Sequence, residues 1–134
     1  MVHVKGFSII ELMFVLIVLS LLSVIALPAY QGYVAKGDIV RCANLVLSTR
    51  MSADSLIQVN NGSAESITTN GLGIGSGEDC DSVSISSATA NGGITIVGSI
   101  DSSVGNQQIR LARGENGVWA CTSSDDKYAP INCP

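Results

Sequence analysis

The stretch KGFSIIELMFVLIVLSLLSVIALPAY, from Lys5 to Tyr30, decides the fold. No charged side chain lies between Glu11 and Lys36, and this length suffices for a helix across the ~30 Å of bilayer hydrocarbon. Glu11 is the exception, because an acidic group near the centre of a span costs roughly 2.5–3.5 kcal/mol. The sequence therefore predicts a membrane-spanning helix whose carboxylate needs an explanation.

An ordinary secretory signal peptide is one alternative, with Lys5 as its basic region and a cut after Ala26. That cut would release a secreted, monomeric binding domain beginning at Leu27. Two features disfavour it: Glu11 falls inside the apolar region, and the small residue Gly6 precedes that region. A second alternative keeps the helix and places Glu11 at the headgroup level, where its cost is small.

The segment Lys5-Gly6-Phe7-Ser8-Ile9-Ile10-Glu11-Leu12 resembles the processing site of type IV prepilins. Pro28, Tyr30 and Tyr33 are similar to the helix pattern of that family, and CTSSDDKYAPINC, residues 121–133, resembles the C-terminal loop of type IVa pilins. The resemblance implies that a prepilin peptidase cuts between Gly6 and Phe7 and methylates the new amine of Phe7. It also implies a leader peptide over residues 1–6, a hydrophobic transmembrane and filament-core helix over 7–34, and a globular head over 35–134.

The physical chemistry of the segment agrees with this resemblance. Lys5 favours an orientation with the N-terminus in the cytoplasm. A buried carboxylate is tolerated when a cation is brought to it, whereas an orphan charge is strongly penalised. We therefore expect Glu11 to pair with the Phe7 amine of a neighbouring subunit, so that the two residues set the register of assembly.

The helix is expected to continue beyond the membrane as an amphipathic segment over residues 35–59. Its apolar face is predicted from helical spacing to contain Ile39, Ala43, Val46, Ala53 and Ile57, widened by Cys42, Leu47 and Met51. Pro28 has no amide hydrogen and crowds the carbonyl of Val24, so a kink or a locally melted turn is expected there.

Residues 60–81 are predicted to form a Gly-rich connection that is too polar for a core element. Four segments of strand character follow, and their turn signals predict an antiparallel meander; they are Ser82–Ser86, Gly93–Ile100, Gln107–Ala112 and Val118–Cys121. The fold class is therefore α+β: a long N-terminal helix, half hydrophobic and half amphipathic, packed on a four-stranded antiparallel sheet over residues 82–121, which is the type IV pilin fold that the resemblance implies.

Four cysteines in a small domain behind a hydrophobic segment indicate disulfides in an oxidising compartment. Three pairings are possible. The favoured one joins Cys121 to Cys133 across a short C-terminal loop and Cys42 to Cys80 between the helix and the following connection. A four-thiolate zinc site remains the alternative, although the cysteines lack the close C-x2-C spacing of such sites.

Composition argues against catalysis and against nucleic-acid binding. The only histidine is His3, in the leader, so the mature chain has none for acid–base chemistry, and we expect neither an enzyme nor a cofactor. Removing Lys5 with the leader leaves six Lys and Arg residues against eleven Asp and Glu residues, a net charge of about −5 that disfavours direct phosphate binding by Arg110, Arg113 and Lys127. Those cations are expected on a solvated sheet face or in contacts between subunits.

Two further motifs are expected to be ordinary turns. The acidic cluster of Glu78, Asp79 and Asp81 could offer oxygens to Ca²⁺ but lacks regular ligand spacing. Asn61-Gly62-Ser63 fits the N-glycosylation acceptor pattern, which also arises by chance.

The resemblance implies a structural subunit that polymerises into an extracellular type IV pilus, with adhesion, twitching motility and possible DNA uptake as roles of the filament. Its implied partners are other copies of the chain, the prepilin peptidase, an inner-membrane assembly platform and a host or abiotic surface. The precursor and subunit pool would reside in the inner membrane. The alternative function is a pseudopilin of a type II secretion or competence system, although major pseudopilins typically lack the terminal disulfide loop.

Overall fold

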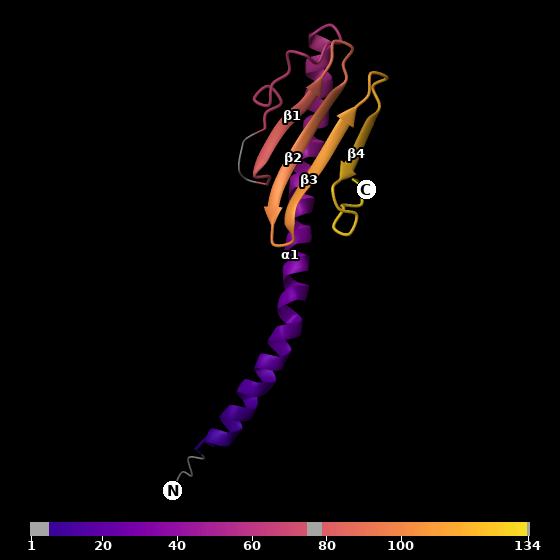
Figure 1. Cartoon of the computed structure of the whole chain (residues 1–134). Coiled ribbons are helices and arrows are strands. Elements are labelled where there is room, and N and C mark those ends of the chain that lie inside the picture. Colours follow the sequence, from indigo (N-terminus) through magenta and orange to yellow (C-terminus); the bar gives the residue numbers. More distant parts are fainter. Residues whose placement is uncertain (1–5, 75–78, 134) are drawn as a thin grey trace.

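The fold is one long helix with a sheet packed on its C-terminal half (Figure 1). The computed structural model describes residues 6–74 and 79–133. Lys5, His3 and Glu78 therefore lie outside the described residues. Helix α1 spans Ile9–Val59, 51 residues, and joins the expected hydrophobic and amphipathic segments without interruption.

Pro28 lies inside α1 and does not interrupt it. The expected locally melted turn is absent, because the residues on both sides of Pro28 are helical. Figure 1 shows instead that the N-terminal half of α1 curves away from the axis of the half that carries the sheet. Proline removes one donor from the helix interior, so a bend is the expected response to the missing hydrogen bond.

The buried face of α1 lies in its C-terminal half and begins at Ala35. Six of the predicted face residues are fully or nearly fully buried there: Ile39, Cys42, Ala43, Val46, Ala53 and Ile57. The prediction was wrong for Met51, whose side chain is 82% exposed on the opposite face. Thr49 is buried instead. Its hydroxyl donates a hydrogen bond to the Val46 carbonyl at 2.7 Å, so this polar group needs no partner from the sheet.

The sheet is the predicted antiparallel meander, with order β1-β2-β3-β4. The strands run somewhat longer than expected and are β1 Ser82–Ala88, β2 Ile94–Ser102, β3 Gly105–Arg113 and β4 Trp119–Ser123. β2 and β3 pair without a break from Ile94 opposite Arg113 to Ser102 opposite Gly105, which makes a tight hairpin. These two central strands carry the main contact with α1.

Close approach of the sheet to α1 depends on Gly98 in β2. A Cβ at this position would lie 2.6 Å from Val46 Cγ2 and 3.0 Å from Cys42 Sγ. Any larger residue would push β2 off the helix. Ile94, Ile96 and Ile100 share this face with Gly98 and are buried, as their alternation predicted.

The connection between α1 and β1 contributes to the core, contrary to the sequence prediction. Ala64, Ile67, Leu72 and Ile74 are all buried in the cluster beneath the sheet. Their apolar side chains are separated by polar turn residues without helical or strand periodicity, so no pattern pointed to them. The Asn61-Gly62-Ser63 motif is the turn that ends the helix: Asn61 and Gly62 have positive φ, and the Gly62 amide donates to the Ile57 carbonyl at 2.8 Å.

Two disulfides connect these elements in the favoured pairing. Cys42 of α1 is bonded to Cys80 just before β1, with 4.8 Å between the Cα atoms. Cys121 of β4 is bonded to Cys133, with 4.7 Å between the Cα atoms. All four cysteines are thereby used, which leaves no thiolate for zinc.

Candidate functional site

The N-terminal half of α1 is an uncovered apolar rod. Side chains from Ile9 to Val34 are exposed, apart from the half-buried Gly32 position. An 18-residue window of this helix has a mean hydropathy of 2.8, and none of it is buried, so the helix is long and apolar enough to cross a membrane. An exposed apolar surface of this extent is unstable in water and marks a membrane or protein contact.

The residues before the rod are accessible and not helical. Gly6 and Phe7 lie in irregular backbone, and the Phe7 side chain is 72% exposed. Ser8 is the N-cap, in an extended conformation with φ −79° and ψ 140°. The peptide bond between Gly6 and Phe7 therefore lies in exposed, non-helical backbone, ahead of the first helical turn at Ile9.

Glu11 lies in the first turn of α1, where the positive end of the helix dipole favours an acidic side chain. Ser8 and Glu11 have the spacing of a capping box, yet the Ser8 side chain makes no cap hydrogen bond. Over residues 6–74 and 79–133 the structure contains two ion pairs, Arg41 with Asp38 and Arg113 with Asp54. Glu11 takes part in neither of them, and its side chain is exposed.

The C-terminal loop lies against α1 near the point where the covered half begins. Tyr128 is half-buried, and its Cε1 would be 4.0 Å from a Cβ placed on Gly32. The Lys127 ammonium lies over the Tyr128 ring, 5.1 Å from its centroid. Pro130 and Cys133 are buried, whereas Ile131 between them is 99% exposed. The disulfide thus closes a loop that presents one exposed apolar side chain, Ile131, close to its C-terminal end.

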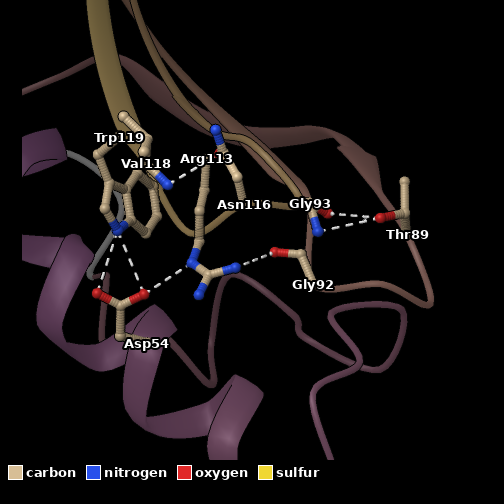
Figure 2. A network of polar contacts seen from close by, with 8 residues as sticks. All are labelled: Asp54, Thr89, Gly92, Gly93, Arg113, Asn116, Val118 and Trp119. Carbon is tan, nitrogen blue, oxygen red and sulfur yellow. Dashed lines mark hydrogen bonds and ion pairs between the residues drawn. The ribbon is translucent and has the colours of Figure 1, made fainter.

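A polar network on the inner side of the sheet joins α1 to three parts of the head (Figure 2). The Asp54 carboxylate accepts from Arg113 Nε at 2.8 Å and from Trp119 Nε1 at 3.1 Å. Arg113 also donates to the Gly92 carbonyl at 2.8 Å, in the turn between β1 and β2. The sequence prediction missed this network. Of its two alternatives for Arg113, the solvated sheet face is wrong, because the side chain is only 17% exposed and is paired with Asp54. The sequence signal that could have indicated this network is Asp54, an acidic residue next to the predicted buried face of the helix.

Among the residues that the structure describes, the other charged side chains form no shared site. Arg110 is exposed on the outer side of β3, apart from Arg113 and Lys127, whose contacts are described above. An Asp81 carboxylate oxygen accepts a hydrogen bond from the Asp101 amide. This contact connects the residue just before β1 to strand β2. Within the described part of the chain no group of three His, Cys, Asp or Glu residues could hold a metal ion.

A family model described as pilin, a bacterial filament protein, matches residues 35–134. The chain belongs to the pilin family. Three of its relatives align over 96–97% of the chain, so the uncovered rod is included in the likeness. A fimbrial protein of Pseudomonas aeruginosa is 30% identical over 155 aligned positions, which cover 97% of this chain and 96% of the relative.

Two further relatives carry the class in their names. The type IV major fimbrial protein FimA of Dichelobacter nodosus is 28% identical, covering 96% of this pilin and 95% of the relative. The type IV major alpha-pilin of Moraxella bovis is also 28% identical, and covers 96% of both chains. This chain is therefore a type IV pilin, a structural subunit that assembles into a filament, and its apolar rod fits the role of membrane anchor.

Proposed function

We propose that this pilin is made as a membrane-inserted precursor and is cut by a prepilin peptidase between Gly6 and Phe7. Residues 1–6 are then the leader, residues 7–34 the membrane and filament-core segment, and residues 35–134 the head. The proposal is supported by the accessible, non-helical backbone at Gly6 and Phe7 and by the change from exposed to buried side chains at Ala35. The same peptidase methylates the Phe7 amine.

The Phe7 amine of one subunit pairs with the Glu11 carboxylate of the next. This pairing is carried by one observation: an exposed carboxylate in the first turn of a rod that is otherwise apolar and uncovered. When rods pack together, Glu11 leaves water, and an unpaired buried charge would oppose assembly. The cut supplies the missing cation at the end of the same segment, so that only processed chains are competent to assemble.

The subunit pool resides in the inner membrane and reaches the extracellular filament through an assembly platform. This chain turns over no substrate, so motor proteins elsewhere supply the energy. The filament serves adhesion and twitching motility through contact with host or abiotic surfaces, and any DNA uptake depends on another subunit as the reader. The last point is supported by the net charge of about −5 after loss of Lys5.

The substitution Glu11→Gln tests the pairing because it keeps size and removes charge. We expect the variant to form no filaments visible by electron microscopy, since breaking a buried ion pair costs about 3–5 kcal/mol. Glu65→Gln is the matched control, because Glu65 is an exposed carboxylate in the head and its loss should leave filaments intact.

The N-terminus of filament subunits is determined in parallel by mass spectrometry. We expect it to begin with methylated Phe7 in the parent. Filaments of normal yield from Glu11→Gln would refute the pairing while leaving the cleavage site in place. Filaments whose subunits retain residues 1–6 would refute the cleavage as well.

A further inference from the structure

The outward face of α1 has a hollow at the boundary between the rod and the covered half. The hollow measures about 480 Å³, and its lining includes Gly37, where a Cβ would meet no atom within 4 Å. Its walls are Tyr30, Tyr33 and Val34 on the rod side and Lys36 and Arg41 on the head side. Aromatic rings and cations therefore surround a recess whose lining includes a residue without a side chain.

The position of this hollow along α1 is set by the apolar span. Tyr30 and Tyr33 are the last aromatic residues of the rod, with side chains 67% and 80% exposed. Tyrosines concentrate at the level of lipid headgroups, where the ring meets hydrocarbon and the hydroxyl meets water. Lys36 is the first charged residue after Glu11, so the hollow begins where the span leaves the hydrocarbon.

The cations of the hollow are available to an anion. Lys36 takes part in neither ion pair of the described residues. Arg41 lies 3.8 Å from Asp38, and these side chains are 71% and 40% exposed. Exposed pairs of this kind contribute little to stability, so a phosphate can replace Asp38 at low cost. Counting Asp38, the hollow carries one net positive charge.

We propose that this hollow binds the headgroup of an anionic phospholipid while the pilin is anchored in the membrane. Lys36 and Arg41 contact the phosphate, and Tyr30 and Tyr33 flank the start of the acyl chains. Charge complementarity and continuity with the membrane span select a lipid as the occupant. The inference rests on the proposed membrane-inserted state, and it assigns to that state a lipid preference set by this chain's own residues.

The test uses the full chain in phosphatidylcholine nanodiscs with a small fraction of spin-labelled lipid. The label sits near the top of the acyl chain, on phosphatidylglycerol in one sample and on phosphatidylcholine in the other. Line broadening of the Gly37 amide signal, relative to the distant Gly117 amide, reports the local lipid. We expect about fivefold enrichment of the anionic lipid, because the attraction of one basic side chain to anionic headgroups is about 1 kcal/mol, which converts to that factor.

Charge-removing variants assign the effect to the hollow. The double variant Lys36→Gln/Arg41→Gln should abolish the enrichment. Arg50→Gln/Arg110→Gln removes the same charge from exposed positions outside the hollow and should keep it. Enrichment that survives the first variant, or that is lost equally in both, overturns the assignment. Loss of enrichment on adding inorganic phosphate also overturns it, because the hollow would then take a free anion.

A second label, deep in the bilayer, separates this proposal from the proposed function. It should broaden the Leu19 amide if the rod lies in the hydrocarbon. Equal broadening of Gly37 by both lipids, with Leu19 broadened, refutes the headgroup site alone. An unbroadened Leu19 refutes the membrane-inserted state, and the headgroup site with it.

Discussion

The indole nitrogen of Trp119 donates to the Asp54 carboxylate across a separation of 65 residues. Trp119 is the first residue of β4, and Asp54 lies in the last part of α1. The same carboxylate binds Arg113 at the end of β3, which in turn holds the Gly92 carbonyl. One side chain of the helix therefore fixes one end of the sheet (Figure 2). The Cys42–Cys80 disulfide connects an earlier part of the same helix to the residues just before β1.

Asp54→Ala should lower the free energy of unfolding by about 2–3 kcal/mol. The estimate follows because hydrogen bonds to charged groups contribute about 1.5–3 kcal/mol, and Arg113 would be left half-buried without its partner. Thermal unfolding of the full chain in detergent micelles, followed by circular dichroism, measures the change. Asp38→Ala is the control, because its exposed ion pair with Arg41 should contribute less than about 0.5 kcal/mol. Equal effects of both substitutions would contradict the role of Asp54.

Gly98→Ala and Gly37→Ala should change stability in opposite directions. At Gly98 the added methyl would lie 2.6 Å from Val46 Cγ2, so overpacking should cost about 1–3 kcal/mol. At Gly37, which lies in α1, the added methyl would meet no atom within 4 Å. Alanine has the higher helix propensity, so the free energy of unfolding should rise by about 1 kcal/mol. Chemical denaturation of the two full-length variants under the same conditions checks both signs. A neutral Gly98→Ala would show that β2 does not depend on close approach to α1.

Removing the Cys42–Cys80 disulfide should destabilise the head more than removing Cys121–Cys133. The two bridges close loops with sequence separations of 38 and 12, for which chain entropy predicts about 4 and about 3 kcal/mol. Paired Cys→Ala variants are compared by thermal unfolding. Hydrogen exchange gives a second readout.

In the Cys121→Ala/Cys133→Ala variant we expect residues 124–133 to lose protection while β2 and β3 keep theirs. Loss of protection throughout the sheet would instead show that the C-terminal loop is needed for the whole head to fold.

Pro28→Ala should straighten and stabilise the exposed half of α1. Alanine restores the donor that proline lacks, and the propensity difference between the two residues is about 3 kcal/mol. We expect hydrogen exchange of the amides near Pro28 to slow by roughly tenfold or more in micelles. The amides of β3 serve as the internal reference and should not change. An unchanged exchange rate near Pro28 would mean that the curvature has another cause.

The long helix, the order of the strands and the pairing of the cysteines could be predicted from the sequence, because each has a local cause. An uncharged run fixes the rod, and alternation in residues 94–100 fixes the inward face of β2. Short sequence separation favours the Cys121–Cys133 loop. None of these needs knowledge of distant contacts.

The remaining features depend on contacts that form only in the folded chain. Ile67 and Leu72 become core residues because the connection folds back under the sheet, and nothing in their neighbours indicates this. Arg113 and Arg110 look alike in the sequence, yet one meets Asp54 and the other meets solvent. Thr49 is buried through a hydrogen bond to its own helix, whereas the more apolar Met51 points away from the sheet.

The start of burial at Ala35 also separates two parts of the chain that differ in their tolerance of insertions. In the rod, almost every side chain is exposed to the surroundings of the molecule, and an insertion within the helix would rotate the residues that follow it. Turns of the head, such as the one at Gly117, lie at the surface, where insertions are tolerated. The surface of the head can therefore be altered at its turns without any change in the rod.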